Sequence, residues 1–179
     1  MLVSRSPKFA EVIATLGMDY IFIDTEHIEA ERTTISFLCR HFAAAGIAPL
    51  VRIPAPDPYE ASVMLDGGAA GIIAPYVESA EQVRALVGAV KYKPLKGRRL
   101  ERILHGEETL EPKLAAYLEQ ANAGKSVIVN IESKPAMEAL DEILAVPGLD
   151  AVLIGPHDLS SSLGIPEEYE NPIYDQAVR

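Results

Sequence analysis

Short, uninterrupted apolar runs recur along the chain, separated by segments with a helical pattern of apolar residues. The runs cover Tyr20–Asp24, Ala48–Ile53, Ala70–Ala74, Ser126–Ile131 and Ala151–Ile154. Continuous rather than alternating apolar residues are typical of parallel strands that are covered on both faces. The interval between the third and fourth runs is long enough for two strand–helix units, so we expect a sixth, weaker strand near Gly97–Ile103.

The segments between these runs carry residues typical of helix ends. Ser6, before a proline, opens the first helical segment and Gly17 closes it, while Asp57, Ser79 and Ser133 are expected N-caps of later helices. Helices alternating with strands predict a parallel sheet with right-handed crossovers. No linker or change of composition divides the chain, so we expect a single domain over residues 1–179.

Two parallel architectures compete for this pattern. A doubly wound sheet with a dinucleotide site should carry a glycine-rich fingerprint after its first strand, and the sequence DTEH stands there instead. A (β/α)8 barrel should carry functional groups at the carboxyl ends of several strands. The strand ends of this chain therefore decide between the two.

Composition narrows the classes of function. The 179 residues carry a formal charge of −10, which disfavours nucleic acid as a partner. The basic segment at residues 91–102, KYKPLKGRRLER, is expected to be a solvated loop or an anion-binding segment. No apolar stretch approaches the length of a membrane span or of a signal peptide core, and Cys39 alone cannot form an internal disulfide, so we expect a cytoplasmic protein with Cys39 in its core.

Polar or cyclic residues follow every strand that we expect. They are Asp24, Glu26, His27, Arg52, Pro75, Tyr76, Glu132, Pro156, His157 and Asp158. Because the carboxyl ends of parallel strands meet at one edge of a sheet, these residues predict a site there and favour the barrel.

The residue types suit enolate chemistry beside a carbonyl group. Glu132 and Asp158 could hold a divalent cation such as Mg²⁺ or Mn²⁺, which polarises a carbonyl. Arg52 could neutralise a developing oxyanion. His27 is the natural general base, and Asp24 could orient its ring.

Each residue also has a structural interpretation that the sequence leaves open. Asp158 could cap the helix that follows it, and Glu132 could pair with Lys134 at the surface. Arg52 could be a structural partner of Asp24. These alternatives differ in which side chains the fold brings together.

The chain resembles the HpcH/HpaI aldolase family of metal-dependent pyruvate aldolases. The resemblance rests on SPKFAEVIATLGMDYIFIDTEH, PLVRIP, GAAGIIAPYVESAEQVRALVGAVKYKP, VIVNIES and PGLDAVLIGPHDLSSSLGIP, in this order along the chain. It implies a (β/α)8 barrel of the phosphoenolpyruvate/pyruvate type. It also implies reversible aldol cleavage of a 4-hydroxy-2-oxo acid to pyruvate and an aldehyde, with Mg²⁺, Mn²⁺ or Co²⁺ as cofactor and a homo-oligomer, a hexamer or trimer of dimers, as the assembly.

The resemblance also implies a role for individual residues. Glu132 and Asp158 match the metal ligands, and Arg52 matches the arginine that contacts the keto and enolate oxygen. His27 matches the histidine of acid–base chemistry, with Asp24 as its partner. The remaining matches are Asp66, expected near a neighbouring subunit's site, and the turn that receives the pyruvyl carboxylate, which is Gly155, Pro156, His157 and Asp158. Beside these matches, we expect Glu26 and Asn130 to lie close to the metal or its water.

Three departures from the family pattern qualify these implications. Asn130 stands where Gln is common, His157 where Ala is common, and KPLKGRRLER replaces a glycine-rich stretch. The length is also short for a barrel of about 250 residues, so we expect a truncated barrel that lacks the start of its first strand and its last strand–helix unit. The missing strand could instead be replaced through oligomerisation. A citrate or malyl-CoA lyase β-subunit and a non-catalytic barrel remnant stay open as alternatives.

Overall fold

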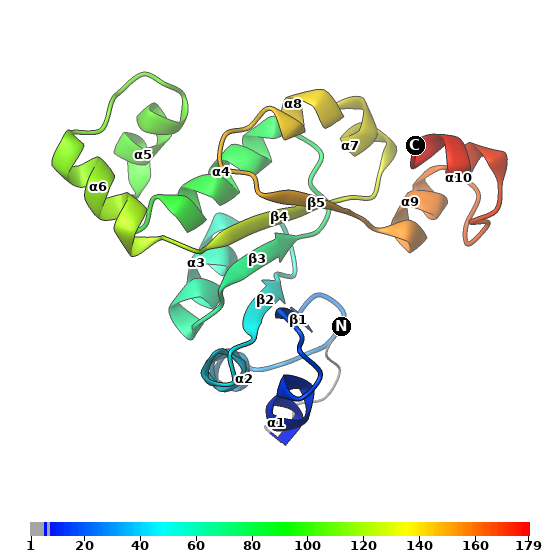
Figure 1. Cartoon of the computed structure of the whole chain (residues 1–179). Helices are drawn as coiled ribbons and strands as arrows, with labels where there is room; N and C mark the ends of the chain where they lie inside the picture. The colour runs from blue at the N-terminus through cyan, green and yellow to red at the C-terminus, as the bar shows by residue number, and fades with distance from the viewer. Residues whose placement is uncertain (1–5, 7) are drawn as a thin grey trace.

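Five parallel strands form one open, curved sheet in the computed structural model, which describes residue 6 and residues 8–179 (Figure 1). The strands are β1 (Tyr20–Asp24), β2 (Ala48–Arg52), β3 (Gly71–Ala74), β4 (Ser126–Ile131) and β5 (Ala151–Ile154), hydrogen-bonded in chain order. Every neighbouring pair is parallel, as the continuous apolar runs predicted. The sheet is therefore half of a barrel, with β1 and β5 at its edges.

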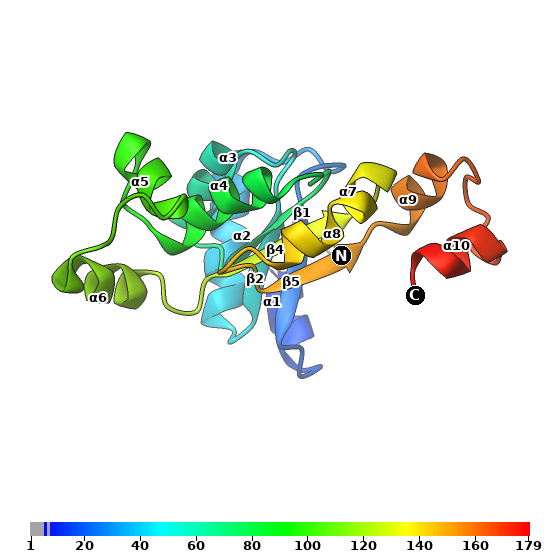
Figure 2. The same ribbon diagram turned by 90° about the horizontal axis from the view of Figure 1, so that it is seen from above.

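Ten helices connect or flank these strands in the described residues. They are α1 (Lys8–Ala14), α2 (Arg32–Ala44), α3 (Pro58–Gly67), α4 (Ala80–Lys91), α5 (Gly97–Leu104), α6 (Pro112–Ala121), α7 (Lys134–Glu138), α8 (Leu140–Leu144), α9 (Pro156–Ser162) and α10 (Pro172–Ala177). Helices α2, α3 and α4 pack side by side and cover one face of the sheet (Figure 1). Figure 2 places α9 and α10 beyond the carboxyl end of β5, with α5 and α6 at the opposite end of the molecule.

Side chains that were expected to cap helices do so. The Asp57 carboxylate accepts from the Tyr59 N–H, the Ser79 hydroxyl from the Gln82 N–H, and Ser133 from the Ala136 N–H. Gly17 follows α1 with φ +67°, a left-handed conformation that glycine adopts without strain.

The sixth strand expected near Gly97–Ile103 is wrong. This segment forms the helix α5, in which Leu100 and Leu104 lie one turn apart and contact the backbone of α4 at Gly88. The sequence also predicts that residues 1–4 are the tail of the shortened first strand, and these residues lie outside the described part of the chain. Residue 6 and residues 8–179 thus contain five strands, which do not close into a barrel.

The register of the sheet decides which side chains meet. Asp24 faces Arg52 across β1 and β2, Arg52 faces Ile73, and Ile73 faces Ile128. Partners in a parallel register point to the same face, and so do residues two apart on one strand. Asn130 and Glu132 therefore lie on the same face as Asp24 and Arg52, opposite to the core side chains that pack under the helices.

No described helix is both long enough and apolar enough to span a bilayer. The core between sheet and helices is made of buried aliphatic side chains from both layers, such as Ile23, Val51, Ile72, Leu86 and Val129. Strand β5, by contrast, is exposed along its whole length.

Candidate active site at the carboxyl ends of the strands

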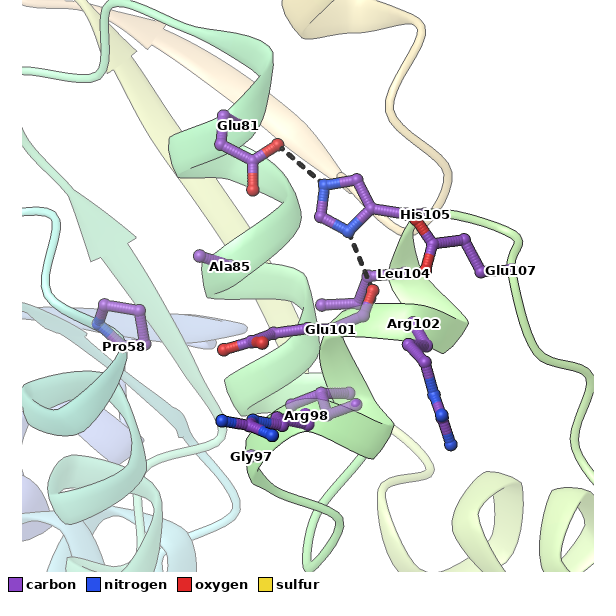
Figure 3. A pocket seen from close by; sticks show the side chains of 11 residues that line it. Pro58, Glu81, Ala85, Gly97, Arg98, Glu101, Arg102, Leu104, His105 and Glu107 are labelled. Carbon is purple, nitrogen blue, oxygen red and sulfur yellow. Dashed lines mark hydrogen bonds and ion pairs between the residues drawn. The ribbon is translucent and has the colours of Figure 1, made fainter.

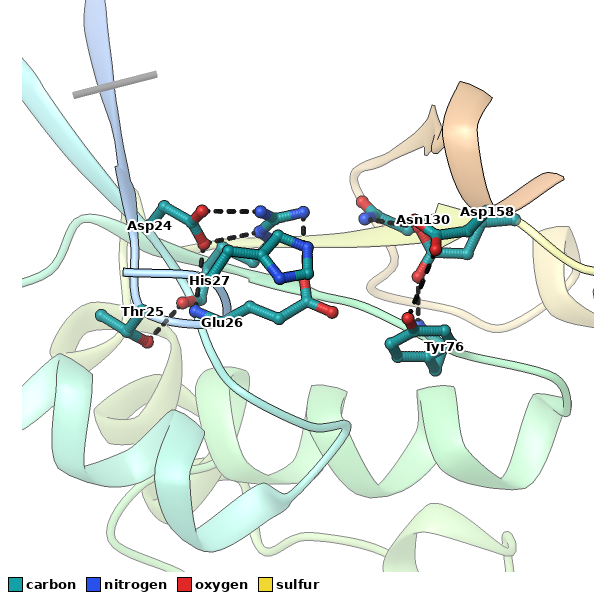
Figure 4. Close-up of polar contacts among 9 residues, drawn as sticks. Asp24, Thr25, Glu26, His27, Tyr76, Asn130 and Asp158 are labelled. Atoms are coloured by element: carbon teal, nitrogen blue, oxygen red, sulfur yellow. Dashed lines mark hydrogen bonds and ion pairs between the residues drawn. The ribbon is translucent and has the colours of Figure 1, made fainter. Parts of the chain in front are cut away.

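Arg52 is the centre of a charged network with Asp24 and Glu26, which are labelled in Figure 4. Its Nε and Nη2 donate to the two carboxylate oxygens of Asp24 over 2.8 and 2.7 Å, and its Nη1 lies 2.9 Å from Glu26 Oε2. The Phe22 ring lies under the guanidinium, 5.4 Å from its carbon to the ring centroid. The Asp24 carboxylate, the Glu26 carboxylate and the Phe22 ring thus hold the Arg52 guanidinium from three sides.

This network is nearly excluded from water, and its pKa values follow from that burial. Burial raises the pKa of Asp24, but hydrogen bonds from Arg52 and from the Glu26 N–H, with the charge of Arg52, bring that pKa below its ordinary value. Burial lowers the pKa of Arg52, and the hydrogen bonds and charge of Asp24 raise it above its usual range. Asp24 and Arg52 are accordingly a charged pair.

Glu26 behaves differently beside the same guanidinium. Burial raises its pKa, the charges of Glu132 and Asp24 add to this effect, and the charge of Arg52 opposes it. Glu26 therefore accepts a proton more readily than Asp24 does. The two carboxylates, two residues apart, have pKa shifts of opposite sign.

The predicted pairing of Asp24 with the His27 ring is not observed in the described contacts, in which the oxygens of Asp24 accept from Arg52 and from the Glu26 N–H. The imidazole Nε2 lies 3.6 Å from Glu26 Oε2 instead, and the His27 side chain is 58% exposed. The alternative that the sequence left open, Arg52 as the partner of Asp24, is the one observed.

Glu132 is a buried carboxylate at the end of β4, and it is held from three sides. Its Oε1 accepts from the Tyr76 N–H over 2.7 Å, and its Oε2 accepts from Asn130 Nδ2 over 3.0 Å. A Cβ on Gly155 would lie only 2.1 Å from Oε2, so glycine is required where β5 ends. Glu132 makes no surface pair with Lys134 in the described structure.

Asp158 lies in the first turn of α9, but Gly155 occupies the N-cap position, so the alternative that Asp158 caps this helix is not the one observed. The Tyr76 hydroxyl donates to Asp158 Oδ1 over 3.4 Å (Figure 4). Burial raises the pKa of the Tyr76 phenol, and the charge of Asp158 adds to this, so the phenol is a donor at neutral pH. Tyr76 thus forms hydrogen bonds with both Asp158 and Glu132.

Sequence reasoning gave no role to two residues of this site. Thr25 binds the Arg52 carbonyl with its N–H over 3.0 Å and with its hydroxyl over 2.5 Å, which ties the end of β1 to β2. Tyr76 connects the two predicted metal ligands, and its position directly after a strand was its only signal in the sequence.

Two predicted residues lie away from this cluster. His157 is exposed, with its Nδ1 3.6 Å from Glu167. Asp66, at the end of α3 that leads into the start of β3, pairs with Lys93 Nζ over 2.5 Å. Its expected place near a neighbouring subunit's site stays a prediction.

The donors of the site fit a hard divalent cation that is bound by few protein ligands. Among the residues that the structure describes, no three Asp, Glu, His or Cys side chains converge on one point. Mg²⁺ and Mn²⁺ are commonly held by one or two carboxylates, with water and substrate as the other ligands. Asn130 Oδ1 is a buried oxygen without a hydrogen bond, so it can accept one from such water or substrate.

Comparison with known proteins agrees with this arrangement. The family model described as HpcH/HpaI aldolase/citrate lyase matches residues 1–178. The chain belongs to this family. The HpcH/HpaI resemblance stated from the sequence motifs is thereby confirmed, and an aldolase or lyase enzyme is the class that it indicates.

Individual HpcH/HpaI relatives cover nearly all of this chain. It is 38% identical over 163 residues to a 2-dehydro-3,6-dideoxy-6-sulfogluconate aldolase of Pseudomonas putida, covering 91% of this chain and 63% of that protein. It is 39% identical over 176 residues to a 2-keto-3-deoxy-L-rhamnonate aldolase of Salmonella paratyphi B, covering 96% and 64%. The chain thus spans less than two thirds of the length of these relatives.

A solved structure shows the same backbone arrangement. The crystal structure of an HpcH/HpaI aldolase from Desulfitobacterium hafniense DCB-2 superimposes with a TM-score of 0.81 at 33% identity, covering 99% of this chain and 68% of that one. The half-barrel described above is therefore a fold that this family uses.

The surroundings of the basic segment at residues 91–102 differ from those of a long groove that binds an anion. It lines a cavity of about 690 Å³ beside α4, in which Glu81 lies 3.3 Å from His105 (Figure 3). Arg99 pairs with Glu108 and Glu111, and Arg102 pairs with Glu108. These acidic partners neutralise much of the charge that a CoA thioester would require, which disfavours the CoA lyase alternative.

Proposed function

We propose that this chain catalyses the reversible aldol cleavage of a 4-hydroxy-2-oxo acid to pyruvate and an aldehyde. The observation that carries the proposal is the buried Glu132 carboxylate, held on one face of the sheet with Arg52 and joined through Tyr76 to Asp158. A buried carboxylate needs a charged partner, a cation or a catalytic task, and no described cationic side chain pairs with Glu132. The family's aldolase relatives support the reaction class.

Glu132 and Asp158 are the residues that would hold Mg²⁺, Mn²⁺ or Co²⁺. A divalent cation bound there supplies a Lewis acid for the keto oxygen of the substrate. The backbone N–H groups of His157 and Asp158, in the first turn of α9, would receive the substrate carboxylate, because Pro156 has no N–H and the Gly155 N–H donates to the Ile131 carbonyl. Asn130, with one buried oxygen unpaired, would accept a hydrogen bond from water or substrate in the same space.

Arg52 would stabilise the negative charge that develops on the keto oxygen. Its guanidinium is fixed by Asp24 before substrate binds, so no side chain has to reorganise during the reaction. Two of its nitrogens pair with Asp24 and Nη1 pairs with Glu26 over 2.9 Å, so an N–H group that these pairs do not use would reach substrate.

His27 would move the proton that the reaction requires. Its Nε2 lies beside Glu26, and no described contact engages Nδ1. In cleavage, a base removes the proton from the substrate's 4-hydroxyl group while the carbon–carbon bond breaks, and an acid then protonates the methylene carbon to give pyruvate. Glu26, with its raised pKa, is placed to exchange a proton with His27.

The proposed function also implies a fold, a barrel of which this sheet is one part. We infer that β1 to β5 are part of a (β/α)8 barrel of the pyruvate type, since the relatives extend beyond this chain. The homo-oligomer expected from the sequence remains part of the same proposal.

The test is pyruvate release from a panel of 4-hydroxy-2-oxo acids, coupled to lactate dehydrogenase, with Mg²⁺, Mn²⁺, Co²⁺ or EDTA. We expect release that requires metal, disappears in Asp158→Asn and persists in Asp141→Asn, a matched control in the first turn of α8. Release in EDTA, or equal loss in both variants, would contradict the proposal. Cleavage of an acyl-CoA ester but of no oxo acid would contradict it in favour of the lyase alternative.

A further inference from the structure

Tyr76 has a backbone conformation that its side chain does not favour. Its φ is +51°, in the left-handed region, where glycine, asparagine and aspartate are the usual occupants. Residues held in this region cluster at functional sites, because the surrounding structure has to maintain them. Tyr76 is the second residue after β3, and it lies at the carboxyl ends of the strands, where the charged residues are.

The left-handed turn directs the two ends of Tyr76 to two different carboxylates (Figure 4). The backbone N–H donates to Glu132 Oε1 over 2.7 Å, a short bond to a charged acceptor. The phenol hydroxyl donates to Asp158 Oδ1 over 3.4 Å, which is a longer and weaker bond. Glu132 follows β4 and Asp158 follows β5, so a residue of a third strand spans both.

The other contacts of Glu132 do not make this connection. Asn130 lies on the same strand as Glu132 and donates to its second oxygen, Oε2. Gly155 limits the position of Oε2 by close packing alone. Tyr76 is the described residue that hydrogen-bonds to both predicted cation ligands.

We propose that Tyr76 is a positioning residue for cation binding, which sets the separation of Glu132 and Asp158 through its left-handed N–H and its phenol. This inference rests on the proposed function, because it assumes that both carboxylates hold the cation. Two carboxylates without this link would have to be brought together by the cation itself, at a cost in affinity.

The test measures the affinity of the protein for Mn²⁺ alone, by electron paramagnetic resonance of free Mn²⁺. Tyr76→Gly and Tyr76→Val both remove the ring, but only glycine accepts the left-handed backbone. Tyr76→Phe keeps the ring and removes the hydroxyl, with Tyr117→Phe, an exposed tyrosine of α6, as its control. Circular dichroism melts confirm that each variant is folded.

We expect Tyr76→Val to bind Mn²⁺ about tenfold more weakly than Tyr76→Gly. Valine does not accept the left-handed backbone, so this variant should lose the hydrogen bond from the N–H of residue 76 to the charged Glu132. Tyr76→Phe should lose about threefold because its lost bond is longer, and Tyr117→Phe should bind as the wild type does. In an Asp158→Asn background, Tyr76→Phe should have no further effect, whereas an unspecific loss of structure would add to that of Asp158→Asn.

Two failures can be told apart. Equal affinities of the Gly and Val variants, together with wild-type affinity in Tyr76→Phe, would overturn the role of Tyr76 and leave the proposed function standing. Wild-type protein that binds no Mn²⁺, or that binds it equally well as Glu132→Gln, would overturn the proposed function itself.

Discussion

Arg52 and Asp24 form a two-pronged ion pair across adjacent strands, with nitrogen–oxygen distances of 2.8 and 2.7 Å. The pair exists because β1 and β2 place the two residues opposite each other in register. The Asp24 side chain has no exposed surface, and that of Arg52 is 12% exposed. Asp24 of the DTEH motif therefore fixes Arg52, whereas the His27 ring lies beside Glu26.

Removal of the Asp24 charge should destabilise the protein far more than removal of the Glu26 charge. Asp24→Asn leaves the buried guanidinium without its paired carboxylate, which costs on the order of 3 kcal/mol of unfolding free energy. Glu26→Gln is expected to cost less than about 1 kcal/mol, because Arg52 keeps Asp24 and a carboxylate with a raised pKa is lost. Urea unfolding at neutral pH measures both, and equal losses would contradict the assignment of Asp24 as the main partner.

The same pair predicts how stability depends on pH. The pKa of Asp24 is lower in the folded protein than in the unfolded chain, so its contribution is present above the unfolded pKa and is lost as pH falls through the folded pKa. Glu26 has the opposite sign: its raised pKa makes it destabilising once pH rises above its unfolded value. The difference in unfolding free energy between wild type and Asp24→Asn should therefore stay constant above about pH 5 and shrink as pH falls below about 4 and through the lower pKa of folded Asp24. A difference that does not shrink at any pH below about 4 would show that Asp24 is not charged in the folded state.

Gly155 should be intolerant of even one added carbon. A Cβ there would lie 2.1 Å from Glu132 Oε2, so Gly155→Ala has to displace the carboxylate from Asn130 and Tyr76. We expect a loss of Mn²⁺ affinity of about tenfold or more, as for a lost hydrogen bond to a charged group. Gly67→Ala, whose Cβ would meet Ser36 at an ordinary 3.6 Å, is the matched control and should bind Mn²⁺ normally. Normal binding by Gly155→Ala would show that Glu132 is not held as described.

Cys39 should be chemically silent in the native protein. It is fully buried in α2, and burial raises the pKa of its thiol to about 11. Ellman's reagent should therefore react with it only after denaturant unfolds the chain. Rapid reaction under native conditions would contradict its place as a core residue.

The sequence predicted the strands well because buried parallel strands have a direct signature in the chain. β1, β4 and β5 have the predicted bounds, and β2 and β3 differ from them by one residue. The strand predicted near α5 is absent for a physical reason: Leu100, Ile103 and Leu104 are spaced three and four apart, which is helical spacing, so this segment half-buries them as a helix and not as a strand.

The sequence predicted which residues lie close together in the site, but it did not predict which of them bind one another. Strand ends identified Asp24, Arg52, Glu132 and Asp158, but the pairing of Arg52 with Asp24 depends on register, which the sequence left open. Tyr76 could not be assigned a role, since tyrosine gives no local signal for a left-handed backbone. Such conformations are imposed by tertiary contacts, here with Glu132 and Asp158.

The most direct test of the central claim is exchange of the methyl protons of pyruvate in deuterated water, followed by NMR. We predict that the protein with Mg²⁺, Mn²⁺ or Co²⁺ exchanges these protons, and that EDTA or Glu132→Gln abolishes the exchange while the matched surface variant Glu138→Gln does not. Folded, cation-loaded protein that leaves the methyl protons in place would contradict the assignment of this site to pyruvate enolate chemistry.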